Sequence, residues 1–75
     1  MRTYYRIYHI CSGLDVAKVA SAAQAYMYIY KDIINNEKLP EQYKTLNLND
    51  LEASFAKSKD DFYGGRLRAV KVEEV

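Results

Sequence analysis

The chain has 75 residues, a formal net charge of +1, one cysteine and one histidine. This length allows one domain with a thin core, because so short a chain buries only ~60–65% of the surface that its unfolded form exposes. One cysteine excludes an internal disulfide and fits a reducing cytoplasm. The flat charge gives no overall attraction to nucleic acid or to a membrane surface.

No apolar run approaches the ~20 residues of a membrane span, and the N-terminus has no signal-peptide pattern. We therefore expect a complete, small cytoplasmic protein with residues 1–75 in a single domain and with no cofactor or metal. The chain contains eight Tyr, two Phe and no Trp. Tyrosine is common at recognition surfaces because it joins a large ring to a hydroxyl, and it also fills the rim of a small core. Both roles stay open here.

Residues 3–10 are rich in β-branched and aromatic side chains and alternate, which predicts a strand. The side that carries Ile7 is expected to face inward, because Arg6 marks the opposite side as solvent-facing. The open side of the sheet then carries Tyr4, Arg6 and Tyr8.

The tetrapeptide 12–15, Ser-Gly-Leu-Asp, allows two predictions. Its glycine tolerates a positive φ and its serine and aspartate bond nearby backbone, which favours a hairpin turn before a short strand at 16–20. Alternatively, its serine caps a helix, since apolar residues over 16–34 also fit a 3.6-residue period. The hairpin is favoured because residues 21–24, Ser-Ala-Ala-Gln, form a capping box that starts a helix at Ala22.

A resemblance supports the hairpin. Tyr5-Arg6, the turn at 12–15 and the alanine-rich helix resemble the opening of a set of small uncharacterised bacterial and phage proteins. In that set a strand, a Ser-Gly-x-Asp turn, a second strand and a helix follow one another, over the equivalent of residues 4 to about 30. The set often has Leu-Gly after the aspartate, where this chain has Val16-Ala17. The resemblance implies a ββα start and no assigned activity.

The helix predicted from Ala22 to about Asn36 has more apolar surface than one sheet face can cover. One stripe includes Ile29 and Ile33. A second stripe, rotated by about one residue, must be covered by another helix or by a partner. We predict that it forms a homodimer contact through Met27, Tyr30 and Ile34.

The segment 37–47 is predicted to be a connection, because Pro40 breaks any helix that runs through it. Within it, residues 41–46 have the option of a helical turn. The anchors of that turn would be Tyr43 and Leu46.

Asn49, with Glu52 at the third position, is predicted to cap a shorter second helix. Gly64-Gly65 ends that segment, and 66–72 is the last strand. The apolar period slips between Ala69 and Val70, which indicates a bulge. The fold class expected is α+β: a two-layer domain with a three-stranded sheet in the order ββααβ, the last strand beside the first, packed on one long and one shorter helix.

Few residues are candidates for catalysis or for metal binding. His9 and Cys11 share one face of the first strand, but a nucleophile pair usually needs a third, orienting group, so a structural role is favoured. Asp60-Asp61 is read as a solvated helix end and Gly64-Gly65 as a turn. No P-loop, nucleophile elbow or metalloprotease motif is present. An enzyme built around His9 and Cys11 is therefore the third hypothesis.

The leading hypothesis is a non-enzymatic module that binds another protein, because tyrosine and arginine dominate such contacts. The predicted contact residues are Tyr4, Arg6, Tyr8, Arg66 and Arg68. Small proteins of this kind are common in phage and mobile elements, where they resemble inhibitors of host defence or regulatory complexes such as anti-CRISPR proteins; this is a likeness of class, not of motif. The second hypothesis is single-stranded nucleic-acid binding by the same Tyr/Arg face.

Overall fold

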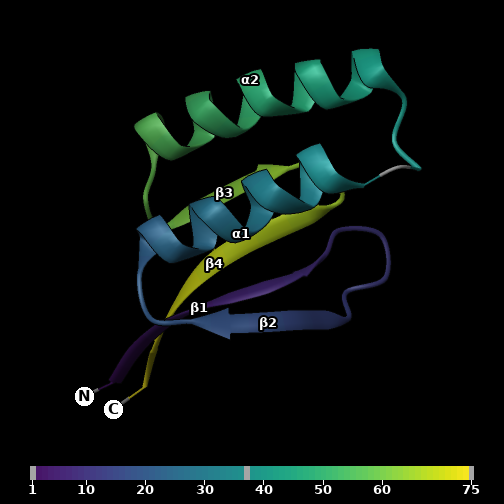
Figure 1. The fold of residues 1–75 in the computed structure, drawn as a ribbon. Coiled ribbons are helices and arrows are strands. Elements are labelled where there is room, and N and C mark those ends of the chain that lie inside the picture. The colour runs from purple at the N-terminus through teal and green to yellow at the C-terminus, as the bar shows by residue number, and fades with distance from the viewer. Residues whose placement is uncertain (1, 37, 75) are drawn as a thin grey trace.

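The computed structural model describes residues 2–36 and 38–74, apart from the side chain of Tyr43. In chain order, one antiparallel hairpin comes before a pair of helices and a second hairpin follows them (Figure 1). The elements in chain order are β1 (Arg2–His9), β2 (Asp15–Val19), α1 (Ala22–Asn35), α2 (Glu41–Lys57), β3 (Asp61–Gly64) and β4 (Leu67–Glu74).

The four strands form one antiparallel sheet in the order β2-β1-β4-β3. The last strand does pair with the first, from Arg2 opposite Glu74 to His9 opposite Leu67, so the two ends of the chain lie side by side (Figure 1). The prediction of a three-stranded ββααβ sheet is wrong, because residues 61–64 form a fourth strand on the outer edge of β4. The chain is α+β with a ββααββ order.

The fourth strand depends on Gly65. This glycine has a φ of 58°, and Gly64 pairs with Leu67, so only two residues close the hairpin. A glycine with positive φ at the first loop position suits the right-handed twist of paired strands. The turn predicted at Gly64-Gly65 is therefore confirmed, but it joins two strands instead of separating a helical segment from the last strand.

The predicted bulge between Ala69 and Val70 is also wrong. β4 pairs with β1 in unbroken register, and the irregularity in the sheet lies between Ile7 and Tyr8, where β1 meets β2. Val70 therefore follows the normal alternation and lies on the side opposite Ala69.

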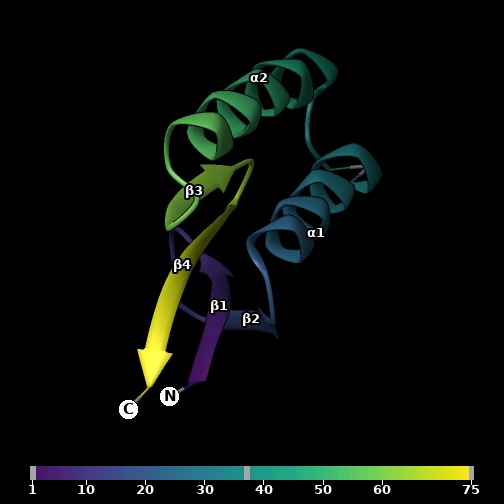
Figure 2. The ribbon, with the colours of Figure 1, turned by 90° about the vertical axis from the view of Figure 1, so that its left-hand side faces the viewer.

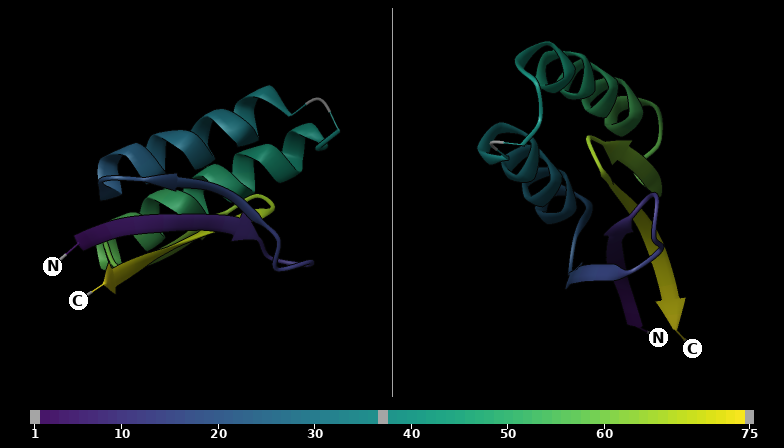
Figure 3. Two further views of the ribbon diagram at one scale, coloured as in Figure 1. Left: turned by 90° about the horizontal axis from the view of Figure 1, so that it is seen from below. Right: turned by 90° about the vertical axis from the view of Figure 1, so that its right-hand side faces the viewer.

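Both helices pack on the same side of the sheet (Figures 1 and 2). α1 contacts all four strands, while α2 packs on β3 and on α1. The result is two layers, with one face of the sheet under the helices and the other face with no described element over it (Figure 3).

α1 begins where the capping box predicted. The Ser21 hydroxyl accepts a hydrogen bond from the Gln24 backbone N–H at 3.2 Å, and the Gln24 side-chain oxygen accepts one from the Ala20 N–H at 2.9 Å. These contacts satisfy backbone donors that a helix start leaves unpaired. The short strand before α1 is confirmed as β2, so the helical alternative from Val16 is excluded.

α2 begins at Glu41, eight residues before the predicted cap at Asn49. Pro40 precedes this helix as its N-cap instead of breaking it: its φ is −59° and its ψ 148°, and its carbonyl accepts the Lys44 N–H at 3.0 Å as the first helical hydrogen bond. Asn49 is an exposed residue inside the helix. Of the two anchors, Leu46 is 61% exposed, and the Tyr43 side chain lies outside what the structure describes.

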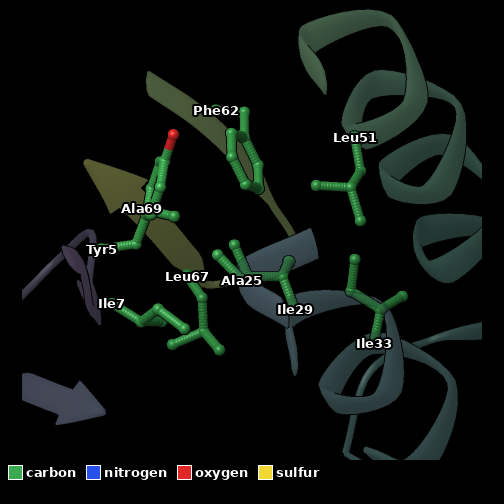
Figure 4. Close-up of a cluster of buried hydrophobic side chains, with 9 residues drawn as sticks. All are labelled: Tyr5, Ile7, Ala25, Ile29, Ile33, Leu51, Phe62, Leu67 and Ala69. Atoms are coloured by element: carbon green, nitrogen blue, oxygen red, sulfur yellow. The ribbon is translucent and has the colours of Figure 1, made fainter. Parts of the chain in front are cut away.

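The core lies between the sheet and the helices (Figure 4). Phe62 from β3 is fully buried and meets Phe55 of α2 edge-on, with 5.5 Å between ring centroids. The Tyr5 ring is buried beside Phe62, and its hydroxyl donates to the Lys59 carbonyl at 2.6 Å. The predicted inward side of β1 is thus confirmed. The buried apolar residues are Tyr5, Ile7, Ala25, Ile29, Ile33, Leu51, Phe62, Leu67 and Ala69.

Candidate binding surface

The uncovered face of the sheet brings together side chains from all four strands. The register sets out three rows across β2, β1, β4 and β3, and alternation puts each row on the side away from the helices. We call this the open face. Its rows are Lys18–Arg6–Val70–Asp61, then Asp15–Tyr8–Arg68–Tyr63, then Tyr4–Val72, with Arg2 and Glu74 opposite each other at the ends of β1 and β4.

Three of the five predicted contact residues lie on β1 as expected. The Arg6 guanidinium lies 4.6 Å from the centroid of the Tyr8 ring, and the Lys18 ammonium lies 5.5 Å from that of Tyr4. The side chains of Tyr4, Arg6 and Tyr8 are all half-buried. Each aromatic ring therefore already stacks with a cation inside the molecule, which holds its orientation.

Arg68, the fourth predicted residue, lies in the same row as Tyr8 and Tyr63. Its guanidinium donates two hydrogen bonds to Asp61, one of them from Nε to Oδ1 at 2.8 Å. This hydrogen bond is the main reason that the pKa of Asp61 is lowered, and the same contact raises the pKa of Arg68. On the other side of the face, Arg6 pairs with Asp15. Both guanidinium charges are thus matched by a carboxylate of the same chain.

Arg66, the fifth predicted residue, does not lie on the open face. It occupies the β3–β4 turn, and its guanidinium pairs with the Asp32 carboxylate of α1 at 3.0 Å. That contact is the main reason that the pKa of Arg66 is raised. Arg66 ties the turn to the helix layer, and the sequence had put it with Arg68 only because both belong to one basic segment.

Several open-face residues were missed from the sequence. Val70 lies between Arg6 and Asp61 in its row, Val72 lies beside Tyr4, and Tyr63 is 48% exposed at the β3 edge. Together with Ile10, 48% exposed, Tyr63 and the Arg68–Asp61 pair line a shallow depression at one end of the face. The sequence did contain a signal for Tyr63: residues 61–64 alternate before a Gly-x turn, and this pattern marks a hairpin.

The predicted dimer stripe on α1 is partly exposed. Met27 is 46% and Ile34 43% accessible, whereas Tyr30 is half-buried and stacks on Tyr26 with 6.1 Å between ring centroids. A shallow depression beside Met27 is lined by Tyr28 and Lys31, among others. These side chains leave an apolar strip on the helix layer, on the far side of the molecule from the open face.

His9 and Cys11 lie at the end of β1 and in the turn that follows it. His9 ends β1 half-buried, Cys11 is exposed in the turn that follows, and no hydrogen bond joins their side chains in the described part of the chain. Asp60 faces Lys71 at 3.6 Å, and Asp61 is held by Arg68. Over residues 2–36 and 38–74, no group of three or more His, Cys, Asp or Glu residues could hold a metal ion.

None of the described helices combines the length and the apolar character that crossing a membrane requires. Comparisons with protein-family models, with curated proteins and with solved structures find no match to this chain. The open face, with its tyrosine and arginine side chains, is the candidate binding surface of this protein.

Proposed function

We propose that this protein is a non-enzymatic, cytoplasmic binding module that docks on protein through the open face. The observation that carries the proposal is the grouping of Tyr4, Tyr8 and Tyr63 with Arg6 and Arg68 on an uncovered sheet face. Tyrosine and arginine supply most of the binding free energy at protein interfaces, because each buries a large area and still forms directed polar contacts.

The open face is also held in place before any partner arrives. The Arg6–Tyr8 stack and the Arg68–Asp61 pair fix side chains that would otherwise be mobile. An interface built from side chains that are already ordered loses less conformational entropy on binding. Val70 and Val72, half-buried between them, provide the apolar centre that such contacts surround.

A second candidate, single-stranded nucleic acid, is favoured by the rings of Tyr4 and Tyr8, on which bases could stack. The charge pattern favours protein instead. The open face carries four basic side chains, Arg2, Arg6, Lys18 and Arg68, against three acidic ones, Asp15, Asp61 and Glu74. Binding to a phosphate backbone needs cations that are free to replace counterions, and here both open-face guanidinium groups of the central rows already face carboxylates.

The test compares the wild-type chain with an open-face variant, Tyr8→Ala with Tyr63→Ala, and with a control on the opposite side, Met27→Glu with Ile34→Glu. Proteins captured from the native host are identified by mass spectrometry, and binding is then measured with the purified partner. We expect the open-face variant to bind at least tenfold more weakly, since two interface aromatics each contribute roughly 1 kcal/mol or more. Equal binding by wild type and the open-face variant would overturn the proposal.

Fluorescence anisotropy with labelled single-stranded DNA and RNA separates the two candidates. Binding at low salt that declines steeply as salt rises, and that Tyr8→Ala weakens, would favour nucleic acid. We expect no such binding. The narrower hypothesis, an inhibitor of a host defence or regulatory complex from a phage or mobile element, is decided by which protein the capture identifies.

A further inference from the structure

We infer that the protein bound by the open face is a second copy of this chain, packed sheet against sheet about a two-fold axis parallel to β1 and β4. This inference rests on the proposed function, because it takes the open face to be a protein-binding surface. It adds the identity of the partner and the way in which the two faces meet.

The first argument is the division of charge across the sheet. On β2 and β1 the open face carries Lys18, Arg6 and Arg2 against Asp15, a net charge of +2. On β4 and β3 it carries Asp61 and Glu74 against Arg68, a net charge of −1. A two-fold axis between β1 and β4 lays the basic half of one copy on the acidic half of the other.

The second argument is that individual rows match. Rotation about this axis keeps each row at its level along the strands and exchanges its two ends. Lys18 then faces Asp61 of the second copy, and Arg2 faces Glu74 of the second copy. In the row that contains Tyr8 and Arg68, the Tyr8 ring faces Arg68 of the second copy, which is a cation–π arrangement.

Part of the apolar centre matches as well, whereas Val70 faces Arg6 of the second copy, whose alkyl stem can cover it. Tyr4 faces Val72 of the second copy across the axis, so that ring and valine cover each other. Asp15 faces Tyr63 of the second copy, where a phenol hydroxyl can donate to the carboxylate. The other in-plane axis, at right angles to the strands, would place like halves together, Lys18 and Arg6 against the same residues of the second copy. Charge therefore selects the axis along the strands.

The area fits a weak, reversible contact. Four strands about 4.8 Å apart and on average about six residues long make a face of roughly 19 by 20 Å. Two such faces give roughly 760 Å² of contact, below the ~1,200–2,000 Å² of stable complexes and in the range of weak, transient ones. We therefore expect a dimer with a micromolar dissociation constant, and one that salt weakens because its outer pairs are exposed.

The first experiment measures mass in solution by sedimentation velocity over low to high micromolar concentration. The wild type should approach twice the 8.7 kDa mass of one chain as the concentration rises. Val70→Arg should remain monomeric, because the axis places residue 70 opposite Arg6 of the second copy, and the two guanidinium groups would repel each other. The matched control, Met27→Glu with Ile34→Glu, should dimerise like the wild type, since these residues lie on α1.

The second experiment exchanges charges, and it does not depend on Val70→Arg folding. Arg2→Glu and Glu74→Arg each put two like-charge pairs into a dimer of one variant and should weaken it about tenfold, given that each exposed pair contributes modestly. Mixing the two variants in equal amounts restores both opposite-charge pairs and should recover dimers that contain one chain of each. Circular dichroism confirms that each variant is folded.

The outcomes separate this inference from the proposed function. Dimers that the open-face variant loses, and that mixing the charge variants restores, support it. A monomer at high micromolar concentration overturns it, as does a dimer that Val70→Arg preserves and the α1 control abolishes. A monomer that still binds a host protein through Tyr8 and Tyr63 leaves the proposed function standing and removes only the self-association. A monomer with no open-face-dependent binding overturns both.

Discussion

Arg68 of β4 and Asp61 of β3 lie diagonally, one row apart on the open face, and their side chains form a two-pronged ion pair that locks the edge strand to its neighbour. Hydrogen bonding from Arg68 lowers the pKa of Asp61. Both side chains are more than 40% exposed, so water screens the pair and its contribution to stability is modest.

This pair predicts a pH dependence. A carboxyl whose pKa is lower in the folded state stabilises the fold above its unfolded pKa of about 3.9, and that stabilisation is lost as the pH falls through the folded pKa. At pH 7, Asp61→Asn should reduce the free energy of unfolding by roughly 0.5–1 kcal/mol. Near pH 2 the variant and the wild type should be equally stable. Urea denaturation at both pH values measures this, and a difference that persisted in acid would contradict it.

Gly65 should tolerate no side chain. Its φ is 58°, and a Cβ atom there would lie 2.9 Å from Cγ1 of the buried Ile33. Gly65→Ala therefore combines backbone strain with overpacking and should lower the free energy of unfolding by about 2–4 kcal/mol. Gly13 is the matched control: its φ is 74°, but a Cβ atom there would meet nothing within 4 Å. Gly13→Ala should cost only about 1 kcal/mol; equal losses would show that contact with Ile33 has no effect.

The sequence predicted structure most reliably where the contacts that fix an element lie within a few residues of one another. Ser21 and Gln24 predicted the start of α1 because the capping contacts are made within four residues. The alternation of residues 3–10 predicted both β1 and its buried side, since one face of a strand must be apolar to pack. Neither inference needed knowledge of distant residues.

The failures occurred where one residue type has two uses. A proline breaks a helix when it lies in the interior and is tolerated where a helix starts. The sequence alone does not show which of these two positions Pro40 occupies. Gly65 both ends helices and closes hairpins, and only the pairing of Gly64 with Leu67 decides between them. The β3 side of the open face followed from that hairpin, so Tyr63 could not be placed until β3 was known. Val70 was misplaced for another reason, the bulge predicted beside it, which the unbroken β1–β4 register excludes.

The helix cap at Ser21 gives a third prediction. Its hydroxyl accepts the Gln24 N–H at 3.2 Å, and Ala has no group that replaces this acceptor. Ser21→Ala should lower the free energy of unfolding by about 1 kcal/mol. Gln42→Ala serves as the control, because Gln42 lies exposed in the first turn of α2, where the N-terminal residue makes no side-chain cap. Chemical denaturation should show no more than about half the Ser21→Ala loss for this control.

The last prediction concerns Asn47, the one buried polar side chain among the described residues, 7% exposed. Its side-chain oxygen accepts the Gly65 N–H at 2.8 Å and so connects the middle of α2 to the β3–β4 turn. Asn47→Ala would leave this buried backbone donor without its acceptor, which should cost about 1–3 kcal/mol of unfolding free energy. Asn47→Asp retains an acceptor oxygen at the same position and tests whether acceptance, rather than size, is what the turn requires.

Asn49 provides the matched control for this contact, because it is the same residue type two positions along the same helix and is exposed. Asn49→Ala should change stability by no more than about 0.5 kcal/mol, and helix propensity favours the alanine. Amide hydrogen exchange gives the decisive measurement: the Gly65 N–H should lose protection in Asn47→Ala and keep it in Asn49→Ala. If Gly65 stays protected in both variants, Asn47 does not hold the turn, and the loss of stability would have to come from packing alone.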